Sequence, residues 1–85
     1  MKSWYLYIVK AKDGSLYTGT TTDIYRRVGE HNAGIGSKSL RGKLPVELMY
    51  NEIYNSCSEA RKREEAIKNW KRVNKLKLIS KGDTS

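Results

Sequence analysis

The chain has 85 residues, enough for one domain with a single modest hydrophobic core and too few for a second. With 38% hydrophobic and 31% charged residues, its composition is that of a globular rather than a disordered chain. The longest apolar run near the start, "WYLYIV", is far shorter than a signal peptide or a membrane span requires. The single cysteine, Cys57, rules out a disulfide framework within the chain and fits a reducing compartment, so we expect a cytoplasmic protein.

The net charge is +8, from seventeen Lys and Arg against nine Asp and Glu. The excess is concentrated between residues 61 and 77, where the acidic residues are Glu64 and Glu65 and the basic ones are Arg61, Lys62, Arg63, Lys68, Lys71, Arg72, Lys75 and Lys77. Such clustering favours DNA or RNA as a partner, through phosphate contacts and counterion release. A solvated surface that only aids solubility is the alternative. The segment has no wide apolar face, which argues against a membrane partner.

Residues 3–9 are rich in aromatic and β-branched side chains and predict a strand, and residues 15–20 resume the pattern after the turn "KDG". A three-residue loop closing with a bulge, with Gly14 in the left-handed conformation, would pair Ala11 with Ser15.

This register places Tyr7 opposite Gly19 and Val9 opposite Tyr17. Tyr7 and Tyr17 are then diagonal neighbours on one face of the sheet, with Tyr5 next along. A two-residue turn would shift the pairing by one and send the two rings to opposite faces. Two interpretations of the pair stay open at this point: half-buried strand aromatics, or parts of a site.

A helix is expected to begin at residues 22–23, with Ile24 and Val28 on its apolar stripe. Arg27 and His31 are four residues apart and therefore lie on one helix face beside that stripe. An arginine in this position indicates an ion pair or a bound phosphate. The histidine either interacts with the helix dipole at the C-terminus or belongs to a site.

Residues 32–45 contain four Gly or Pro residues and predict a loop, and residues 46–54 alternate as expected for a third strand. Ser56 matches the first position of a capping box before a helix over residues 57–72, and a short last helix is expected over residues 74–79 with Asn74 as its cap. The order ββαβα with a short final helix predicts one compact domain of the α/β (α+β) class, in which helices flank a small three-stranded sheet.

The second expected helix has a carboxylate in an apolar stripe. Cys57, Ala60, Glu64 and Ile67 follow one another at spacings of three, four and three. A buried charge is costly unless it is paired or bound to a metal. Glu64 therefore pairs with an arginine such as Arg27, or it holds a cation, and Mg²⁺ prefers carboxylate, water and phosphate ligands.

Five features occur in a fixed order along residues 3–80: Tyr5-Leu6-Tyr7, Tyr17-Thr18-Gly19, Arg27 and His31 on a helix, and "EARKRE" ending at Glu64. Together they resemble the GIY-YIG nuclease domain. "HNAGIGSKSLRGKLPVEL" and "REEAIKNWKR" are similar to its small stand-alone bacterial members, the YhbQ-like subfamily. Tyr5 stands where the family name has Gly, and Thr18 stands where it has Ile.

The resemblance implies the GIY-YIG fold and a role for each site residue. The Tyr7 hydroxyl would take a proton from an attacking water, and Tyr17 and His31 would orient that water or help to deprotonate it. Arg27 would hold the scissile phosphate, and Glu64 would bind one divalent ion, Mg²⁺ or Mn²⁺. Metal and arginine together would neutralise the charge that develops on the phosphate oxygens.

The resulting hypothesis is a monomeric, metal-dependent endonuclease that hydrolyses phosphodiester bonds of DNA rather than RNA, including structured or damaged DNA in repair or recombination. The expected nucleic-acid contacts are Arg26, Lys38, Arg41, Lys68, Lys71 and Arg72. The alternative is a non-catalytic or weakly catalytic nucleic-acid-binding module of the same fold. Glu64 separates the two, because a carboxylate facing a bound phosphate would only repel it in a pure binder.

Overall fold

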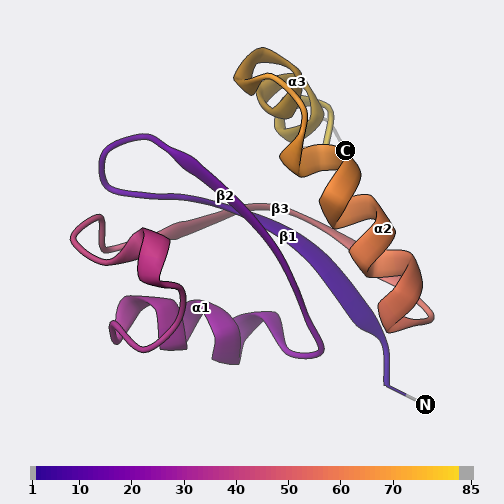
Figure 1. Cartoon of the computed structure of the whole chain (residues 1–85), viewed down its shortest axis with the longest axis horizontal. Helices are drawn as coiled ribbons and strands as arrows, with labels where there is room; N and C mark the ends of the chain where they lie inside the picture. The colour runs from indigo at the N-terminus through magenta and orange to yellow at the C-terminus, as the bar shows by residue number, and fades with distance from the viewer. Residues whose placement is uncertain (1, 83–85) are drawn as a thin grey trace.

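A computed structural model of the chain describes residues 2–82 and shows one three-stranded antiparallel sheet with helices on both faces (Figure 1). The elements are β1 (Trp4–Lys10), β2 (Leu16–Thr21), α1 (Ile24–Asn32), the 3-10 turn η1 (Lys38–Leu40), β3 (Glu47–Tyr54), α2 (Cys57–Lys68) and α3 (Arg72–Gly82). The strand order is β2-β1-β3. The predicted fold class and element order are confirmed. None of the helices described here has the length and apolar character needed to cross a membrane.

The hairpin has the predicted register. The amide of Ala11 donates to the carbonyl of Ser15 at 2.8 Å, and Gly14 has a φ of 88°. Tyr7 pairs with Gly19, and Val9 pairs with Tyr17. A glycine is favoured at position 14 because residues that carry a side chain rarely adopt a positive φ of this size.

The sheet separates two hydrophobic clusters. On one face, Tyr7 and Val9 pack with Ile24 of α1 and with Leu40 of η1. On the other face, Leu6 and Ile8 pack with residues of α2 and α3, including Ile67 and Ile79. Successive strand residues point to opposite faces, so the central strand β1 contributes to both clusters (Figure 1).

Helices α1 and α2 have N-terminal caps, and the predicted cap at Ser56 is confirmed. Asp23 accepts a hydrogen bond from the backbone of Arg26, and Ser56 accepts one from the backbone of Glu59. Each supplies an acceptor to an amide that the helix itself leaves unsatisfied. The helix expected to begin at residues 22–23 therefore begins at Ile24, with Asp23 as its cap.

The predicted end of the second helix and start of the third are wrong. α2 ends at Lys68, not at residue 72, because the amides of Asn69 and Trp70 bond to carbonyls three residues back and tighten the last turn. α3 begins at Arg72 and runs to Gly82, so Asn74 lies inside it rather than capping it. The loop at 32–45 also contains η1, whose Leu40 is buried in the α1-side cluster.

Candidate functional site

Tyr7 lies at the centre of the candidate site. Its side chain is 1% exposed and crosses the backbone of β2 at Gly19. A Cβ atom on Gly19 would lie 2.6 Å from the Tyr7 hydroxyl oxygen, a distance that real Cβ atoms do not show. The absence of a side chain at position 19 therefore lets the phenol reach across the edge strand.

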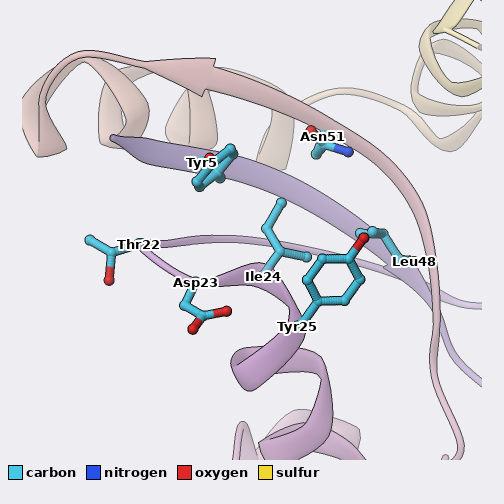
Figure 2. A pocket seen from close by; sticks show the side chains of 7 residues that line it. All are labelled: Tyr5, Thr22, Asp23, Ile24, Tyr25, Leu48 and Asn51. Atoms are coloured by element: carbon cyan, nitrogen blue, oxygen red, sulfur yellow. The ribbon is translucent and has the colours of Figure 1, made fainter. Parts of the chain in front are cut away.

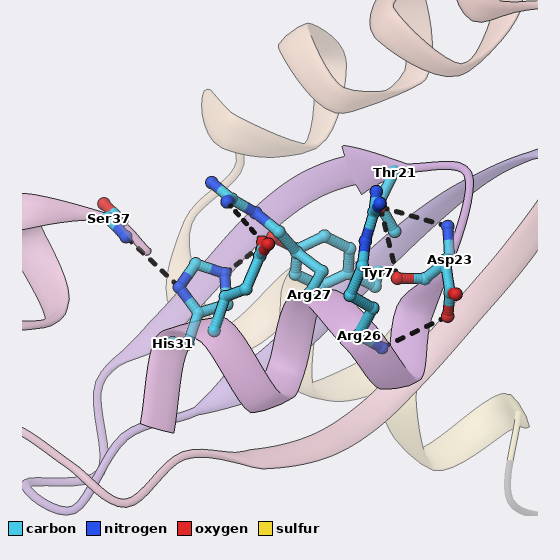
Figure 3. A network of polar contacts seen from close by, with 8 residues as sticks. Tyr7, Thr21, Asp23, Arg26, Arg27, His31 and Ser37 are labelled. Atoms are coloured by element: carbon cyan, nitrogen blue, oxygen red, sulfur yellow. Dashed lines mark hydrogen bonds and ion pairs between the residues drawn. The ribbon is translucent and has the colours of Figure 1, made fainter. Parts of the chain in front are cut away.

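His31 holds the Tyr7 hydroxyl from the last turn of α1. Its Nε2 atom lies 2.8 Å from the Tyr7 oxygen, and its Nδ1 atom accepts a hydrogen bond from the backbone of Ser37 at 3.3 Å (Figure 3). A backbone amide can only donate, so the neutral imidazole carries its proton on Nε2. His31 then donates to the Tyr7 oxygen.

The loop after α1 fixes the histidine, and the sequence interpretation missed this. A Cβ on Gly36 would overlap Nδ1 of His31, so the backbone approaches the ring only because residue 36 is glycine. The side chain of Ser37 also accepts from Ser39 and caps η1. The sequence carries no local signal for this contact, because the loop and the helix meet only in the folded chain.

Arg27 lies one turn before His31 and beside Tyr7 (Figure 3). Its guanidinium pairs with Glu30 at 3.1 Å, and both side chains are about one-third exposed, at 33% and 34%. Of the ion pairs considered from the sequence, the one with Glu64 does not form, because Glu30 on the same helix is the partner. The spacing of three residues between Arg27 and Glu30 was the available signal.

Tyr17 completes a cluster of three rings. Its ring centroid lies 6.4 Å from that of Tyr7 and 5.3 Å from that of His31, and the second contact is edge-on. The predicted placement of Tyr7 and Tyr17 on one face is therefore confirmed. Half-buried Tyr17 leaves the cluster accessible from outside the domain.

The protonation states follow from the surroundings. Burial raises the pKa of Tyr7 to about 12, although the Arg27 guanidinium acts in the opposite direction. Burial and the positive charge of Arg27 lower the pKa of His31 below its ordinary value. At neutral pH the pair is thus a neutral phenol and a neutral imidazole beside a permanent cation.

Glu64 approaches from α2, which covers the opposite face of the sheet (Figure 1). Its side chain is 18% exposed, pairs with the Lys68 ammonium at 2.7 Å and accepts from the Thr20 hydroxyl at 3.3 Å. Its charge is one of the smaller contributions that raise the pKa of Tyr7 after burial. Glu64 therefore adjoins the ring cluster across β2, which is an edge strand.

The residues present fit a divalent ion held by a single carboxylate. Among residues 2–82 there is no group of three or more His, Cys, Asp or Glu that could hold a metal. Mg²⁺ commonly takes one or two carboxylates and completes its shell with water and substrate phosphate. Glu64 offers up to four lone-pair positions, of which Lys68 and Thr20 use two.

The six residues expected to contact nucleic acid are all exposed, but they lie on both sides of the sheet. Arg26 of α1, Lys38 of η1 and Arg41 after η1 belong to the α1 side, whereas Lys71 lies between α2 and α3 and Arg72 begins α3 (Figure 1). The sixth, Lys68, is the partner of Glu64.

Arg63, in the same basic segment, has a structural role. It makes two hydrogen bonds to Glu52, of 3.0 and 3.1 Å, and its guanidinium lies 5.1 Å from the Trp70 ring centroid. These contacts fasten α2 to β3.

The profile of the GIY-YIG catalytic domain matches residues 3–77, and the chain belongs to this family of nuclease domains. Membership supports an endonuclease type of activity on nucleic acid.

Its relatives include the UPF0213 protein of Staphylococcus saprophyticus, 52% identical over 82 residues that cover 96% of this chain and 100% of the relative. The UPF0213 protein of Staphylococcus haemolyticus is 51% identical over 93% of this chain and 96% of its own. Two solution NMR structures have the same fold. The UPF0213 protein BH0048 of Bacillus halodurans has a TM-score of 0.62 at 41% identity and covers 96% of this chain and 88% of its own. Protein EF2693 of E. faecalis has a TM-score of 0.65 at 38% identity, and the match covers 95% of this chain and 86% of that protein's chain.

Proposed function

We propose that this protein is a divalent-metal-dependent endonuclease that hydrolyses phosphodiester bonds of DNA, including branched, nicked or damaged DNA. The observation that carries the proposal is the Tyr7 hydroxyl, held by His31 on one side and flanked by the Arg27 cation. A buried phenol with such partners is placed for proton transfer rather than for packing alone.

Each residue of the site has its own role in the proposed hydrolysis. Arg27 binds the scissile phosphate and opposes the negative charge that grows on its oxygens. Tyr7, in its anionic form, accepts a proton from the attacking water, and the Nε2 proton of His31 stabilises the phenolate oxygen through the hydrogen bond between them. Both nitrogens of His31 are engaged by the protein, so it acts on Tyr7 rather than on water directly, and the more exposed Tyr17 orients the water.

Glu64 would hold the divalent ion, Mg²⁺ or Mn²⁺, which supplies Lewis-acid stabilisation of the phosphate when bound. Thr20 orients the carboxylate through its hydroxyl. The exposed basic residues on both sides of β2 supply phosphate contacts outside the reacting centre.

A second candidate, a nucleic-acid-binding module without turnover, is favoured by one observation. The Lys68 ammonium already neutralises Glu64, which removes the repulsion that a bare carboxylate would exert on phosphate. One experiment separates the two functions. Branched, nicked and single-stranded DNA are incubated with the protein, with and without Mg²⁺ or Mn²⁺, beside the Glu64→Ala variant. Divalent-dependent cleavage that Glu64→Ala lacks supports the nuclease, whereas binding without cleavage of any substrate supports the module.

A further inference from the structure

A hollow of about 290 Å³ lies on the α1 side of the sheet, away from the ring cluster. Tyr5 of β1, Leu48 of β3 and Ile24 and Tyr25 of α1 form its apolar walls (Figure 2). The polar side chains of Asp23 and Asn51 also line it. These residues come from three elements, so the hollow is a product of the fold rather than of one loop.

The hollow and the candidate active site share a sheet face and a helix. Tyr7 is paired with Gly19 of β2 on one side and with Asn51 of β3 on the other. The Tyr7 ring extends over Gly19 of β2, toward the ring cluster. Asn51, the residue of β3 that pairs with Tyr7, lines the hollow. α1 contributes to both, through Arg27 and His31 to the cluster and through Tyr25 to the hollow.

The lining suits a flat heteroaromatic ring that carries polar edge groups. The Tyr25 side chain is 88% exposed, so its ring is available for stacking, and Tyr5 is half-buried in the wall. Asn51 offers a donor and an acceptor, and Asp23 keeps one carboxylate oxygen beyond the one that caps α1. These are the groups that pair with the edges of nucleobases. The carboxylate of Asp23 would repel a phosphate, which favours a base within the hollow.

Positive charge adjoins the hollow. A neighbouring depression shares Tyr5, Thr22 and Asp23 with it and adds Lys2 and Arg26. Arg26 directly precedes Arg27 in α1. Arg26 thus adds a cation at the edge of the hollow, on the same helix as Arg27 and Tyr25.

We propose that this hollow binds one unstacked nucleobase of a nucleic acid that is held at Arg27, with Tyr25 as the stacking platform. The proposal rests on the proposed function and adds to it a preference for substrates with a single-stranded or flipped nucleotide beside the cleavage point. Base stacking on an aromatic side chain contributes about 1–3 kcal/mol per base, equivalent to about 5- to 150-fold in affinity.

The first test is an NMR titration of the ¹⁵N-labelled full chain with dAMP, dGMP, dCMP or TMP, and with deoxyribose 5-phosphate as the probe without a base. The nucleotides should shift backbone amides at residues 22–25 and 48–51, and the sugar phosphate should not. Equal shifts with the sugar phosphate would overturn the proposal, because phosphate alone would then account for binding.

The second test uses oligonucleotides that contain 2-aminopurine, either single-stranded or fully paired, as DNA and as RNA. Tyr25→Ala should weaken binding of the single-stranded probe about 5- to 150-fold and remove the fluorescence change, while Tyr25→Phe stays within about twofold of the parent. Ile35→Ala, at an exposed apolar side chain in the loop after α1, serves as the control. Because Tyr25 is exposed, its loss leaves the fold intact.

The outcomes keep the two proposals apart. Cleavage of DNA without any effect of Tyr25→Ala on affinity or fluorescence would overturn the base pocket and leave the nuclease standing. Tyr25-dependent binding without cleavage would establish the pocket and remove the nuclease.

Discussion

The hydroxyl oxygen of Tyr7 and the Nε2 atom of His31 lie 2.8 Å apart, and each side chain is 1% exposed. This hydrogen bond joins the central strand to the last turn of α1 across the hydrophobic cluster. Tyr7 and His31 are both titratable and both buried in this cluster. The stability of the fold and the activity should therefore both depend on pH.

The stability of the fold should fall in mild acid because of His31. Burial and Arg27 lower its pKa in the folded state, whereas the unfolded chain keeps a value of about 6.5. As pH falls, the unfolded state therefore binds the proton first. The contribution of neutral His31 to the free energy of unfolding is fully present above about pH 6.5, and it is lost as pH falls through the lower pKa of the folded state. Urea unfolding of wild type and His31→Gln at pH 7.5 and pH 5.0 measures it. The stability difference between the two proteins should shrink at pH 5.0, and a constant difference would contradict the assignment.

Removing the Tyr7 hydroxyl should greatly reduce the cleavage rate but lower the stability of the fold only slightly. Tyr7→Phe keeps the ring and loses one hydrogen bond, which costs about 1 kcal/mol, but cleavage should slow by about 10²–10⁴-fold. With a pKa of about 12 the reactive phenolate is scarce at neutral pH, so wild-type cleavage should rise about tenfold per pH unit. Tyr54→Phe, which removes a hydrogen-bonded hydroxyl on the opposite face of the sheet, is the matched control. A pH-independent rate, or equal losses in both variants, would exclude Tyr7 as the base.

Two Gly→Ala substitutions should change the stability of the fold in opposite directions. At Gly19 the new methyl group would meet the Tyr7 hydroxyl and ring carbons at 2.6–3.0 Å, so Tyr7 must shift away from His31. We expect a loss of about 1–3 kcal/mol. At Gly29, inside α1, nothing lies within 4 Å of the new atom, and alanine should stabilise the helix by about 0.5–1 kcal/mol. Thermal melts followed by circular dichroism compare them, and a Gly19→Ala protein as stable as wild type would refute the crowding.

Thr18→Val should stabilise the protein. The Thr18 hydroxyl is buried, and among residues 2–82 no group forms a hydrogen bond with it. Valine has the same shape without the unsatisfied hydroxyl, so we expect a gain of about 1 kcal/mol, or about 4–8 °C in melting temperature. Thr21→Val is the control, because the Thr21 hydroxyl bonds to both the amide and the carbonyl of Asp23. If both substitutions destabilise equally, the Thr18 hydroxyl has a partner after all.

Changes at Glu64 and Lys68 should act on the metal in opposite directions. Glu64→Gln should abolish divalent-dependent cleavage and leave the fold stable, since a pair at this spacing and exposure contributes only about 0.3–0.5 kcal/mol. Lys68→Met should tighten Mn²⁺ binding, because the ammonium no longer competes for the carboxylate. Calorimetric titration with Mn²⁺ measures both variants without relying on activity. Weaker Mn²⁺ binding by Lys68→Met would show that the lysine assists the metal instead.

The sequence was informative where local chemistry decides the outcome. Gly14 determines the loop, the loop determines the register, and the register places Tyr7 and Tyr17 together. It was uninformative where distant segments meet: nothing local in "GIGS" indicates that the amide of Ser37 meets His31, or that Thr20 reaches Glu64 from another element.

The end of α2 was misplaced for a related reason. Lys71 and Arg72 are favourable helix formers, but the tight turn at Asn69 and Trp70 ends the helix before them.

The burial of Tyr7 and His31 affects how the family's sequences should be interpreted. Both side chains are among the largest fully buried ones, so a relative that had lost catalysis would still need large side chains at these two positions to fill its interior. Arg27 and Glu64, with side chains 33% and 18% exposed, contribute much less packing and could change without harming the fold. In a survey of relatives, loss of Arg27 or Glu64 should therefore be the more frequent mark of an inactive member, because Tyr7 and His31 are retained for packing as well as for catalysis.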